Sequence, residues 1–319
     1  MQRVGIIGVG QIGGTLTHMI LQHIPQVHIG LYDVNEDLVQ GKVWDLEEAS
    51  IIGGYEGHLE VLSSLRAFEE YDVLVITAGR SRTPGMNRND LLQENAKILK
   101  SISRQIQEFR GVAVVVTNPV DLMARFFSDL HPLPSSRVLG MAGILDESRM
   151  AARIKAFTGM KGESLRPCVV GPHSDRMIPL EYVRVGPGAL ADIISLSVEQ
   201  KVSIVQNTRY GGVRIVEKLK SGSAFYGPAA GCFRMIQNIL EIREDVLTCS
   251  VQMGEESPIQ DITPKIFFGW PVLLGKQGIK KRVMPCMSAQ ETSLLRNTLL
   301  ELQIEYKSFF ESLECEKDS

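Results

Sequence analysis

Residues 3–13 have the sequence RVGIIGVGQIG, in which a short apolar run passes directly into the glycine pattern GxGxxG. A run this continuously apolar is typical of a strand that is buried on both faces, as in a parallel sheet. A helical pattern follows and ends at Pro25, and a second apolar run, residues 27–32, is closed by Asp33. Strand, glycine turn, helix and second strand in this order predict the first unit of a dinucleotide-binding sheet.

Each glycine of the pattern has its own expected task. Gly8 permits a tight turn, Gly10 lets a pyrophosphate approach the main chain, and Gly13 lets the helix pack closely on the strand. The amino end of the helix then faces the phosphate charge. Asp33 follows Gly13 by 20 residues and is expected to bind both ribose hydroxyls and to repel a 2′-phosphate, which favours NAD over NADP. A glycine turn with an incidental acid is the less favoured alternative.

Apolar runs and helical patterns alternate up to residue 145, with further strands expected at residues 71–77, 112–116 and 137–140. This alternation predicts an α/β fold with a doubly wound, Rossmann-type parallel sheet. From residue 146 onward the pattern is mixed, with strands expected at 164–170 and 177–185 and a helix at 195–220 interrupted near Gly211-Gly212. We therefore expect an NAD-binding domain over residues 1–145 and a mixed α+β substrate domain over residues 146–319.

Bulk composition narrows the function class. The chain has 319 residues, 44% hydrophobic and 22% charged, and a net charge of −3, which creates no field that attracts nucleic acid or membranes. Its five cysteines form no CxxC pair, which argues against a disulfide framework or a metal site and indicates reduced thiols. The start of the chain lacks the pattern of a signal peptide, and no apolar run approaches the ~20 residues of a spanning helix. We expect a cytoplasmic enzyme that binds no metal.

A cationic loop with the sequence GRSRTPGMNRND occupies residues 79–90, between an expected strand and an expected helix. Three arginines in so short a segment exclude a packed core position. The loop is either a solvated surface segment or a lid whose guanidinium groups meet an anionic substrate. The loop taken alone favours the first alternative.

From about Gly5 to Lys281 the chain resembles the lactate/malate dehydrogenase family. The segments that carry the resemblance are GVGQIGG, GKVWDLEEAS, ITAGRSRTPGMNRNDLLQEN, TNPVD, LDESRM, GPHSDRMIP and SGSAFYGPAA. Their order and spacing together are specific, and within the family the loop is most similar to that of malate enzymes of lactate dehydrogenase-like sequence. The resemblance implies an NAD-dependent oxidoreductase of the tricarboxylic acid cycle that acts on a small dicarboxylate as a homodimer or homotetramer.

His173 and Asp146 are the expected catalytic pair. Histidine exchanges a proton near neutral pH, and His173 lies in a Gly/Pro/Ser/Asp turn between two expected strands, unlike the other five histidines. Asp146 resembles the family's carboxylate partner, which fixes the imidazole tautomer and stabilises its cation. A plain helix N-cap is the alternative for Asp146.

Three arginines are expected to act on the substrate. Arg149 lies three residues after Asp146 and by resemblance binds the 1-carboxylate, with a structural salt bridge to Asp146 as the alternative. In the loop, the pattern R-x-PGM-x-R assigns Arg82 to the distal carboxylate and Arg88 to the C2 carbonyl, where it is also catalytic. Lactate enzymes have a neutral Gln at the Arg82 position, and an arginine buried there against pyruvate would lack a partner. Arg80 has no assigned role beyond a solvated charge.

Asn118 resembles the family residue that hydrogen-bonds the substrate oxygen and contacts the nicotinamide. The complete expected cofactor-binding set is Gly8, Gly10, Gln11, Ile12, Gly13, Asp33, Thr77, Ala78, Gly79, Asn95 and Asn118. We expect an NAD-dependent malate dehydrogenase that transfers hydride reversibly between malate and oxaloacetate. A lactate or other 2-hydroxy-acid dehydrogenase is the first alternative, and a catalytically silent NAD-binding regulatory protein is an alternative of another class. An NAD-dependent glycosidase is disfavoured because no metal-binding Cys/His pair is evident.

The histidine turn departs from the family pattern at two positions. Ser174 stands where glycine is frequent, and a serine can strain a backbone that suits glycine, although some malate enzymes also have serine there. Arg176 is unusual after Asp175 and is expected to pair at a subunit or domain contact. Pro172 is expected to hold Gly171 in an extended conformation.

Overall fold

The computed structural model describes the chain except residues 81–87, 221, 254–258, 260–264 and 316–319, and the side chains of residues 88, 89, 314 and 315. The chain forms two compact units, and neither is continuous in sequence. Unit 1 contains Met1–Met141, Ala224–Asp245 and Leu273–Lys281, and unit 2 contains Ala142–Ser223, Val246–Val272 and Arg282–Ser319. No helix in the described part of the chain is long and apolar enough to span a membrane.

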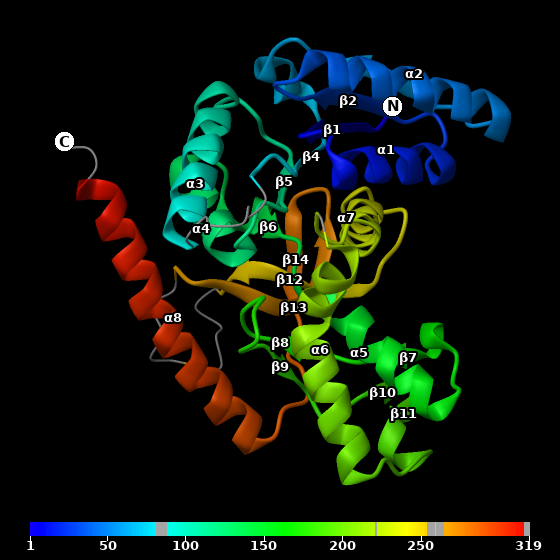
Figure 1. Ribbon diagram of the computed structural model, residues 1–319, viewed down its shortest axis with the longest axis vertical. Helices are drawn as coiled ribbons and strands as arrows, with labels where there is room; N and C mark the ends of the chain where they lie inside the picture. The colour runs from blue at the N-terminus through cyan, green and yellow to red at the C-terminus, as the bar shows by residue number, and fades with distance from the viewer. Residues whose placement is uncertain (81–87, 221, 254–258, 260–264, 316–319) are drawn as a thin grey trace. The chain divides into compact units, whose positions relative to one another are not determined.

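Unit 1 is built on six parallel strands (Figure 1). These are β1 (Arg3–Ile7), β2 (His28–Tyr32), β3 (His58–Val61), β4 (Val73–Ile76), β5 (Val112–Val115) and β6 (Val138–Gly140). Their order is β6-β5-β4-β1-β2-β3, and each neighbouring pair is parallel. The chain moves outward in one direction from β1 and in the other from β4, which is the doubly wound arrangement. The predicted Rossmann-type sheet is therefore confirmed.

Burial explains the sequence of these strands. All the residues of β4 and β5 are fully buried, as a parallel sheet covered on both faces requires. The covering helices are α1 (Gln11–His23), α2 (Glu36–Gly53), α3 (Arg88–Gln105), α4 (Val120–Leu130), α7 (Tyr226–Ile239) and the 3₁₀ turns η1 (Leu65–Glu70) and η2 (Ser135–Arg137). Within unit 1, α1 packs against α7 and α3 against α4.

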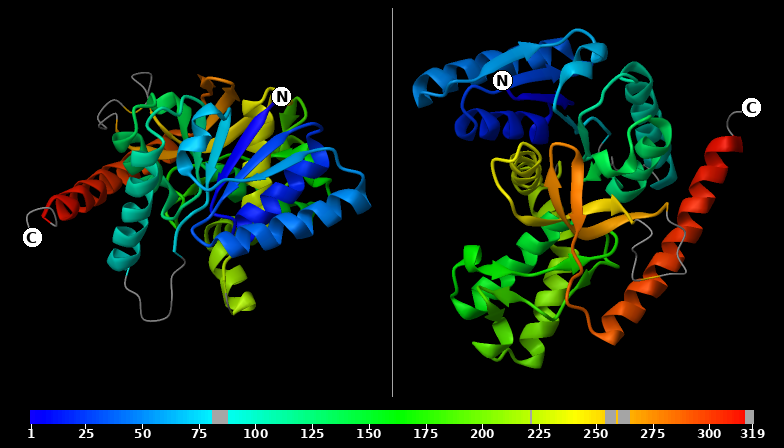
Figure 2. Two further views of the ribbon diagram at one scale, coloured as in Figure 1. Left: turned by 90° about the horizontal axis from the view of Figure 1, so that it is seen from above. Right: turned by 180° about the vertical axis from the view of Figure 1, so that it is seen from behind.

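Unit 2 is the mixed domain. Its helix α5 (Gly143–Thr158) packs against α6 (Val198–Leu219) and against strand β12 (Val246–Gln252). Short elements lie between the helices, namely η3 (Gly162–Ser164), β7 (Leu165–Arg166), β8 (Val169–Val170), β9 (Ile178–Pro179), β10 (Arg184–Val185), β11 (Gly188–Ala189) and η4 (Leu190–Asp192). The chain crosses to unit 1 within β13 (Phe267–Gly275) and continues into β14 (Gly278–Arg282). The last described element is α8 (Ala289–Cys315), a long unbroken helix (Figure 2).

Two expectations for unit 2 are wrong. The strands expected at residues 164–170 and 177–185 are not continuous: each run is divided into two strands of two residues, separated by residues without regular structure. Helix α6 is not interrupted at Gly211-Gly212 but continues from Val198 to Leu219. Packing of α6 against α5 outweighs the cost of about 1 kcal/mol for each glycine in a helix interior.

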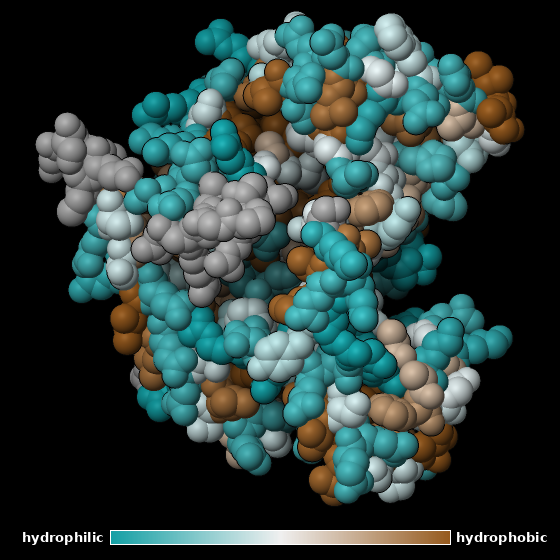
Figure 3. Space-filling model, in the orientation of Figure 1, coloured by the Kyte–Doolittle hydropathy of each residue, from teal (hydrophilic) through white to brown (hydrophobic). Residues whose placement is uncertain are grey.

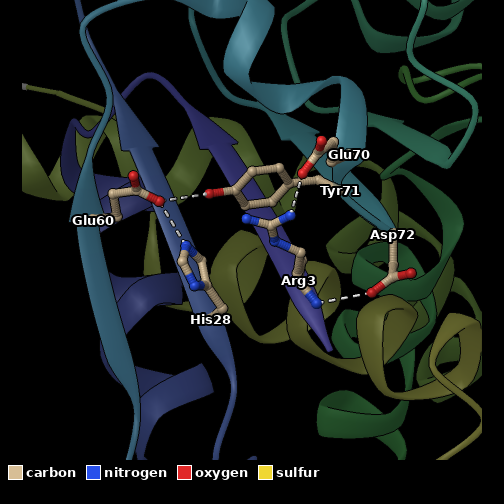
Figure 4. A network of polar contacts seen from close by, with 6 residues as sticks. All are labelled: Arg3, His28, Glu60, Glu70, Tyr71 and Asp72. Carbon is tan, nitrogen blue, oxygen red and sulfur yellow. Dashed lines mark hydrogen bonds and ion pairs between the residues drawn. The ribbon is translucent and has the colours of Figure 1, made fainter. Parts of the chain in front are cut away.

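A polar network joins the amino ends of several strands of unit 1 (Figure 4). Glu60 Oε2 lies 2.7 Å from His28 Nε2 and accepts a hydrogen bond from the Tyr71 hydroxyl at 3.4 Å. Arg3 binds Glu70 at 2.7 Å and lies over the Tyr71 ring. Ligands bind at the opposite, carboxyl ends of such strands. We therefore assign this network to stabilising the fold and not to ligand binding.

We predict an alkaline effect of Tyr71 on stability. Burial, with the charge of Glu60, raises the pKa of Tyr71 to about 12, above its ordinary value of 10.0. The folded protein therefore holds this proton more tightly than the unfolded chain, and the free energy of unfolding falls as pH rises above 10. Tyr71→Phe removes this contribution, and the fall between pH 8 and pH 11 should be smaller by about 1 kcal/mol in urea titrations. An equal fall in the free energy of unfolding of the parent and of Tyr71→Phe would contradict the assignment of this effect to Tyr71.

Candidate functional site

The glycine turn after β1 has two crowded positions and one open position. Gly8 has φ +95°, and a Cβ there would lie 2.5 Å from the main-chain nitrogen of Ala78. A Cβ on Gly13 would lie 2.1 Å from the carbonyl oxygen of Gly8. Around Gly10, in contrast, no described atom lies within 4 Å of the position that a Cβ would take. The fold itself therefore needs glycine at 8 and 13, whereas Gly10 leaves space beside the main chain.

The amino end of α1 is suited to an anion. Gly10 precedes the helix, and the first turn, which contains Gln11, Ile12 and Gly13, has neither an acidic residue nor a side-chain cap. The exposed N–H groups and the helix dipole of such a terminus favour a phosphate group. These residues fit the pyrophosphate of a dinucleotide, which this turn would hold through its main chain.

Asp33 is fixed beside the same turn. Its Oδ2 accepts a hydrogen bond from the Val9 N–H at 2.8 Å, and its Oδ1 accepts one from the Asn35 N–H at 3.2 Å. The carboxylate at the end of β2 is thus tied to the glycine turn at the end of β1. In this position the carboxylate can accept hydrogen bonds from the ribose of a dinucleotide whose phosphate lies in the turn.

Lys42 is a cationic residue of this region that the sequence did not single out. From α2 its Nζ donates a hydrogen bond to the carbonyl oxygen of Gly10 at 2.8 Å. Desolvation lowers the pKa of Lys42, while the charges of Asp33 and Asp45 act in the opposite direction. The available signal was the position of Lys42 on the helix that follows Asp33, within the family-like segment GKVWDLEEAS.

The loops after β4 and β5 are joined by Asn95. The Asn95 Oδ1 accepts a hydrogen bond from the Arg80 N–H, and the Asn95 Nδ2 donates one to the Asn118 carbonyl, each at 2.8 Å. Asn95 is only 1% exposed. Thr77 is linked to the glycine turn, since its hydroxyl donates to the Gly8 carbonyl at 2.5 Å. The expected cofactor residues Thr77 and Ala78 thus border the glycine turn, Gly79 lies beside Thr117 and Asn95, and the Asn95 amide holds the two loops together.

The expected catalytic residues of unit 2 form a linked triad. His173 Nδ1 lies 2.7 Å from Asp146 Oδ2, and Arg149 Nη1 lies 2.7 Å from Asp146 Oδ1. The Asp146 side chain is 2% exposed, whereas the side chains of His173 and Arg149 remain 17% and 15% exposed. Because a carboxylate only accepts hydrogen bonds, Nδ1 carries the hydrogen, and Nε2 is the nitrogen that can exchange a proton with a substrate.

The geometry of the triad bears on the alternatives for Asp146 and Arg149. Ala142 occupies the N-cap of α5, so Asp146 is not a helix cap. Arg149 does form the salt bridge with Asp146, but this bond uses only Nη1. Arg149 Nε is buried and has no hydrogen-bond partner among the described residues. A guanidinium so arranged can bind a carboxylate through its remaining donors.

Arg149 lies against the two glycines of α6. A Cβ on Gly211 would lie 2.9 Å from Arg149 Cδ, and one on Gly212 would lie 3.1 Å from Arg149 Nη2. These glycines therefore make room for the guanidinium. The sequence showed them only as an apparent helix break, because their neighbour is 62 residues away along the chain.

The turn that carries His173 corrects two expectations. Gly171 has φ +91°, so it is left-handed rather than extended: without a Cβ it escapes the restriction that Pro172 imposes on other residues. Ser174 is not among the described residues with positive φ, and its hydroxyl accepts a hydrogen bond from the Arg176 N–H at 3.2 Å. Serine is therefore accommodated without the expected strain.

Arg176 pairs within unit 2. It binds Glu301 at 3.4 Å and Glu305 at 2.8 Å, both on α8. These bonds lie within one unit, so they are not a domain contact, and the expectation of a subunit contact stays a prediction. Since both acids are half exposed or more, the pairs add little stability.

The arginine loop is only partly described. Arg82 lies outside the described residues, and Arg88 is described only as the first residue of α3, without its side chain. Arg80 forms a 3.6 Å ion pair with Glu94, and its side chain is 65% exposed. Arg80 is therefore a solvated charge, as expected, and the roles of Arg82 and Arg88 stay predictions.

Comparison with known proteins assigns both halves of the chain to one family. Residues 2–140 match the NAD binding domain of lactate/malate dehydrogenase, and residues 144–313 match the alpha/beta C-terminal domain of that family. Among curated relatives, the malate dehydrogenase of Pelagibacter ubique is 35% identical over 287 residues, 88% of each chain.

Solved structures agree with the curated relatives. The malate dehydrogenase of Cryptosporidium parvum superposes with a TM-score of 0.87 at 33% identity, covering 96% of this chain and 99% of that one. The lactate dehydrogenase of the same organism, solved with lactic acid and NAD, gives 0.88 at 28% identity, covering 97% and 98%. The likeness in fold therefore does not distinguish lactate from malate enzymes, and the choice of substrate depends on individual residues.

We predict opposite results for alanine at Gly13 and at Gly10. Gly13→Ala places a methyl group against the Gly8 carbonyl and should lower the free energy of unfolding by about 1–3 kcal/mol. Gly10→Ala meets no described atom and should fold like the parent, but its methyl group should weaken NADH binding at least about tenfold. Urea titration and NADH fluorescence measure the two effects. Unchanged NADH affinity in Gly10→Ala would contradict the assignment of the pyrophosphate to this position.

Proposed function

This chain belongs to the lactate/malate dehydrogenase family, and we propose that it is an NAD-dependent malate dehydrogenase that interconverts malate and oxaloacetate. NAD, when bound, supplies the hydride acceptor or donor. The observation that carries the proposal is the Asp146 carboxylate that pairs with both His173 and Arg149 in unit 2. The triad provides a proton and a carboxylate-binding cation, which are two requirements of 2-oxo-acid reduction.

In the proposed reduction, His173 Nε2 gives a proton to the C2 oxygen as hydride arrives at C2. The imidazolium that donates this proton is stabilised by Asp146, which also holds the ring orientation. In malate oxidation the same nitrogen takes the hydroxyl proton back. Arg149 binds the 1-carboxylate through its donors that do not bind Asp146.

The choice of oxaloacetate over pyruvate rests on the sequence of the arginine loop. Arg82 pairs with the distal carboxylate, Arg88 polarises the C2 carbonyl, and Asn118 hydrogen-bonds the substrate oxygen. The R-x-PGM-x-R pattern at residues 82–88 and the malate dehydrogenase names of relatives at 32–35% identity support this part of the proposal. A lactate enzyme is the second candidate, since lactate dehydrogenases superpose equally well.

We also infer a cytoplasmic homodimer or homotetramer of the tricarboxylic acid cycle. No disulfide joins Cys168, Cys232, Cys249 and Cys286, the cysteines with described side chains, which supports a reducing compartment. In the view of Figure 3 the surface is mostly hydrophilic, with separate apolar patches. On α2, Trp44, Ile51 and Ile52 are more than half exposed, as a helix that meets a partner subunit would be.

The substrate is tested by exchanging the charge at residue 82. The parent should prefer oxaloacetate to pyruvate in kcat/KM by at least about 10²-fold, because a buried arginine without a partner costs several kcal/mol. Arg82→Gln should lower kcat/KM for oxaloacetate and raise it for pyruvate. The matched control is Arg80→Gln, which removes the same charge from the exposed neighbour and should keep the parent ratio. A parent that prefers pyruvate would overturn the malate assignment.

Catalysis itself is tested by His173→Asn. This change removes the exchangeable proton and should lower kcat for oxaloacetate by about 10²–10⁴-fold. NADH affinity should stay at the parent value, because the glycine turn belongs to unit 1 and His173 to unit 2. A parent without turnover on any 2-oxo acid, but with intact NADH binding, would favour the silent regulatory alternative.

A further inference from the structure

Glu147, the residue after Asp146, belongs to a second polar cluster in unit 2. The Thr248 hydroxyl donates a hydrogen bond to Glu147 Oε1 at 2.5 Å. The main-chain N–H groups of Thr248 and Val169 also bond to this carboxyl group. Successive residues of a helix point in different directions, so Asp146 reaches His173 and Arg149 while Glu147 reaches two strands.

These bonds join the elements that bring the catalytic pair together. Glu147 and Asp146 share the first turns of α5, and Val169 is in β8, which continues directly to Gly171 and His173. Thr248 is in β12, against which α5 packs. One carboxyl group therefore connects the helix of Asp146, the strand that leads to His173, and a third strand.

The packing around these bonds is tight. A Cβ on Gly143, the first residue of α5, would lie 2.2 Å from Thr248 Cγ2. On the other side, Gly171 is bound to Gly269 by two main-chain hydrogen bonds, of 3.0 and 2.8 Å. The start of α5 and the start of the histidine turn are thus both held in place, and Glu147 is the side chain that spans them.

The charge of Glu147 is also controlled. Burial raises the pKa of Glu147 to about 8, and the charge of Asp146 adds to this effect, while the bonds from Thr248 and Val169 oppose it. Among the described residues, Glu147 also acts on the thiol of Cys168, beside β8, whose pKa is raised by burial and further by Glu147. At neutral pH the carboxyl is largely protonated, so it can bond to Thr248 without adding a second negative charge next to Asp146.

We propose that Glu147 is a positioning residue for the reaction, one that holds the Asp146 helix and the His173 turn in register through Thr248 and Val169. This inference rests on the proposed function, because it assigns Glu147 to the geometry of the acid/base pair. Glu147 does not touch the substrate. It acts through the 2.7 Å contact between Asp146 and His173.

The test compares two substitutions of similar size. Glu147→Gln keeps an oxygen acceptor and should retain the parent kcat for oxaloacetate within about threefold at pH 7, since the protonated acid and the amide are alike in charge. Glu147→Leu removes every hydrogen bond of the carboxyl and should lower kcat about 10–100-fold, with KM for NADH unchanged. Rescue by glutamine distinguishes hydrogen bonding from the filling of space.

The pH profile separates positioning from a merely structural role. A looser Asp146 stabilises the His173 imidazolium less, so the alkaline limb of oxaloacetate reduction should move to lower pH in Glu147→Leu by about one unit. It should stay at the parent position in Glu147→Gln. The imidazole titration of His173, followed by NMR without substrate, should show the same downward shift and does not depend on turnover.

Thr248→Val provides a second variant if Glu147→Leu does not fold. It removes only the hydroxyl, and it should shift the pH profile in the same direction with a several-fold loss of kcat, which Thr248→Ser should restore. The matched control is Thr298→Val, a buried threonine on α8 whose hydroxyl bonds to the Leu294 carbonyl within its own helix. This control should keep the parent kcat and pH profile.

The possible results are distinct. A parent that is inactive with oxaloacetate would overturn the proposed function, and the NMR titration would then decide the positioning role alone. An active parent whose Glu147→Leu and Thr248→Val variants keep its kcat and His173 titration would overturn this inference. So would a Thr298→Val variant that loses as much activity as Thr248→Val.

Discussion

The chemistry of unit 2 depends on the burial of one carboxylate. At 2% exposure, the Asp146 side chain has almost no water to solvate its charge, and a buried charge is tolerated only when it is paired and hydrogen-bonded. His173 and Arg149 meet this need, one at each oxygen. In the proposed reaction the same bonds therefore serve the fold and the chemistry: the partners that stabilise Asp146 are the residues that we propose as the proton donor and as the cation for a 2-oxo acid.

Two consecutive acids of α5 receive opposite environments. Asp146 bonds to the Arg149 guanidinium and the His173 imidazole, whereas Glu147 meets hydroxyl and amide groups, and burial raises the pKa of Glu147 to about 8. Divergent surroundings for neighbouring carboxyl groups are a common way to give them different tasks. In our proposal, Asp146 stabilises a cation during the reaction, while Glu147 remains mostly neutral and connects elements of secondary structure. We therefore infer that contacts extending into β8 and β12 set the geometry of the proposed catalytic pair.

The sequence was sufficient for features that local pattern encodes. Strands buried on both faces are continuously apolar, and the glycine turn between the first strand and its helix leaves a distinct spacing, so the parallel sheet could be predicted. The triad could be predicted because the family resemblance connects Asp146, Arg149 and His173. The return of residues 224–245 and 273–281 to unit 1, the continuity of α6 through Gly211-Gly212, the place of Lys42 and the contacts of Glu147 could not. Each of these depends on a partner far away in the chain, and local periodicity carries no information about such partners.

The glycines of the turn are kept during evolution for different reasons. At Gly8 and Gly13 the surrounding chain would reject any side chain, whatever the protein binds. Gly10 has no described neighbour within 4 Å of a Cβ position, so within the described part of the chain only a ligand would keep larger residues away from it. A descendant that no longer binds a dinucleotide but keeps the fold would retain Gly8 and Gly13 and would accept other residues at position 10. A substitution at position 10 is therefore the first change in sequence that we expect after the loss of the cofactor.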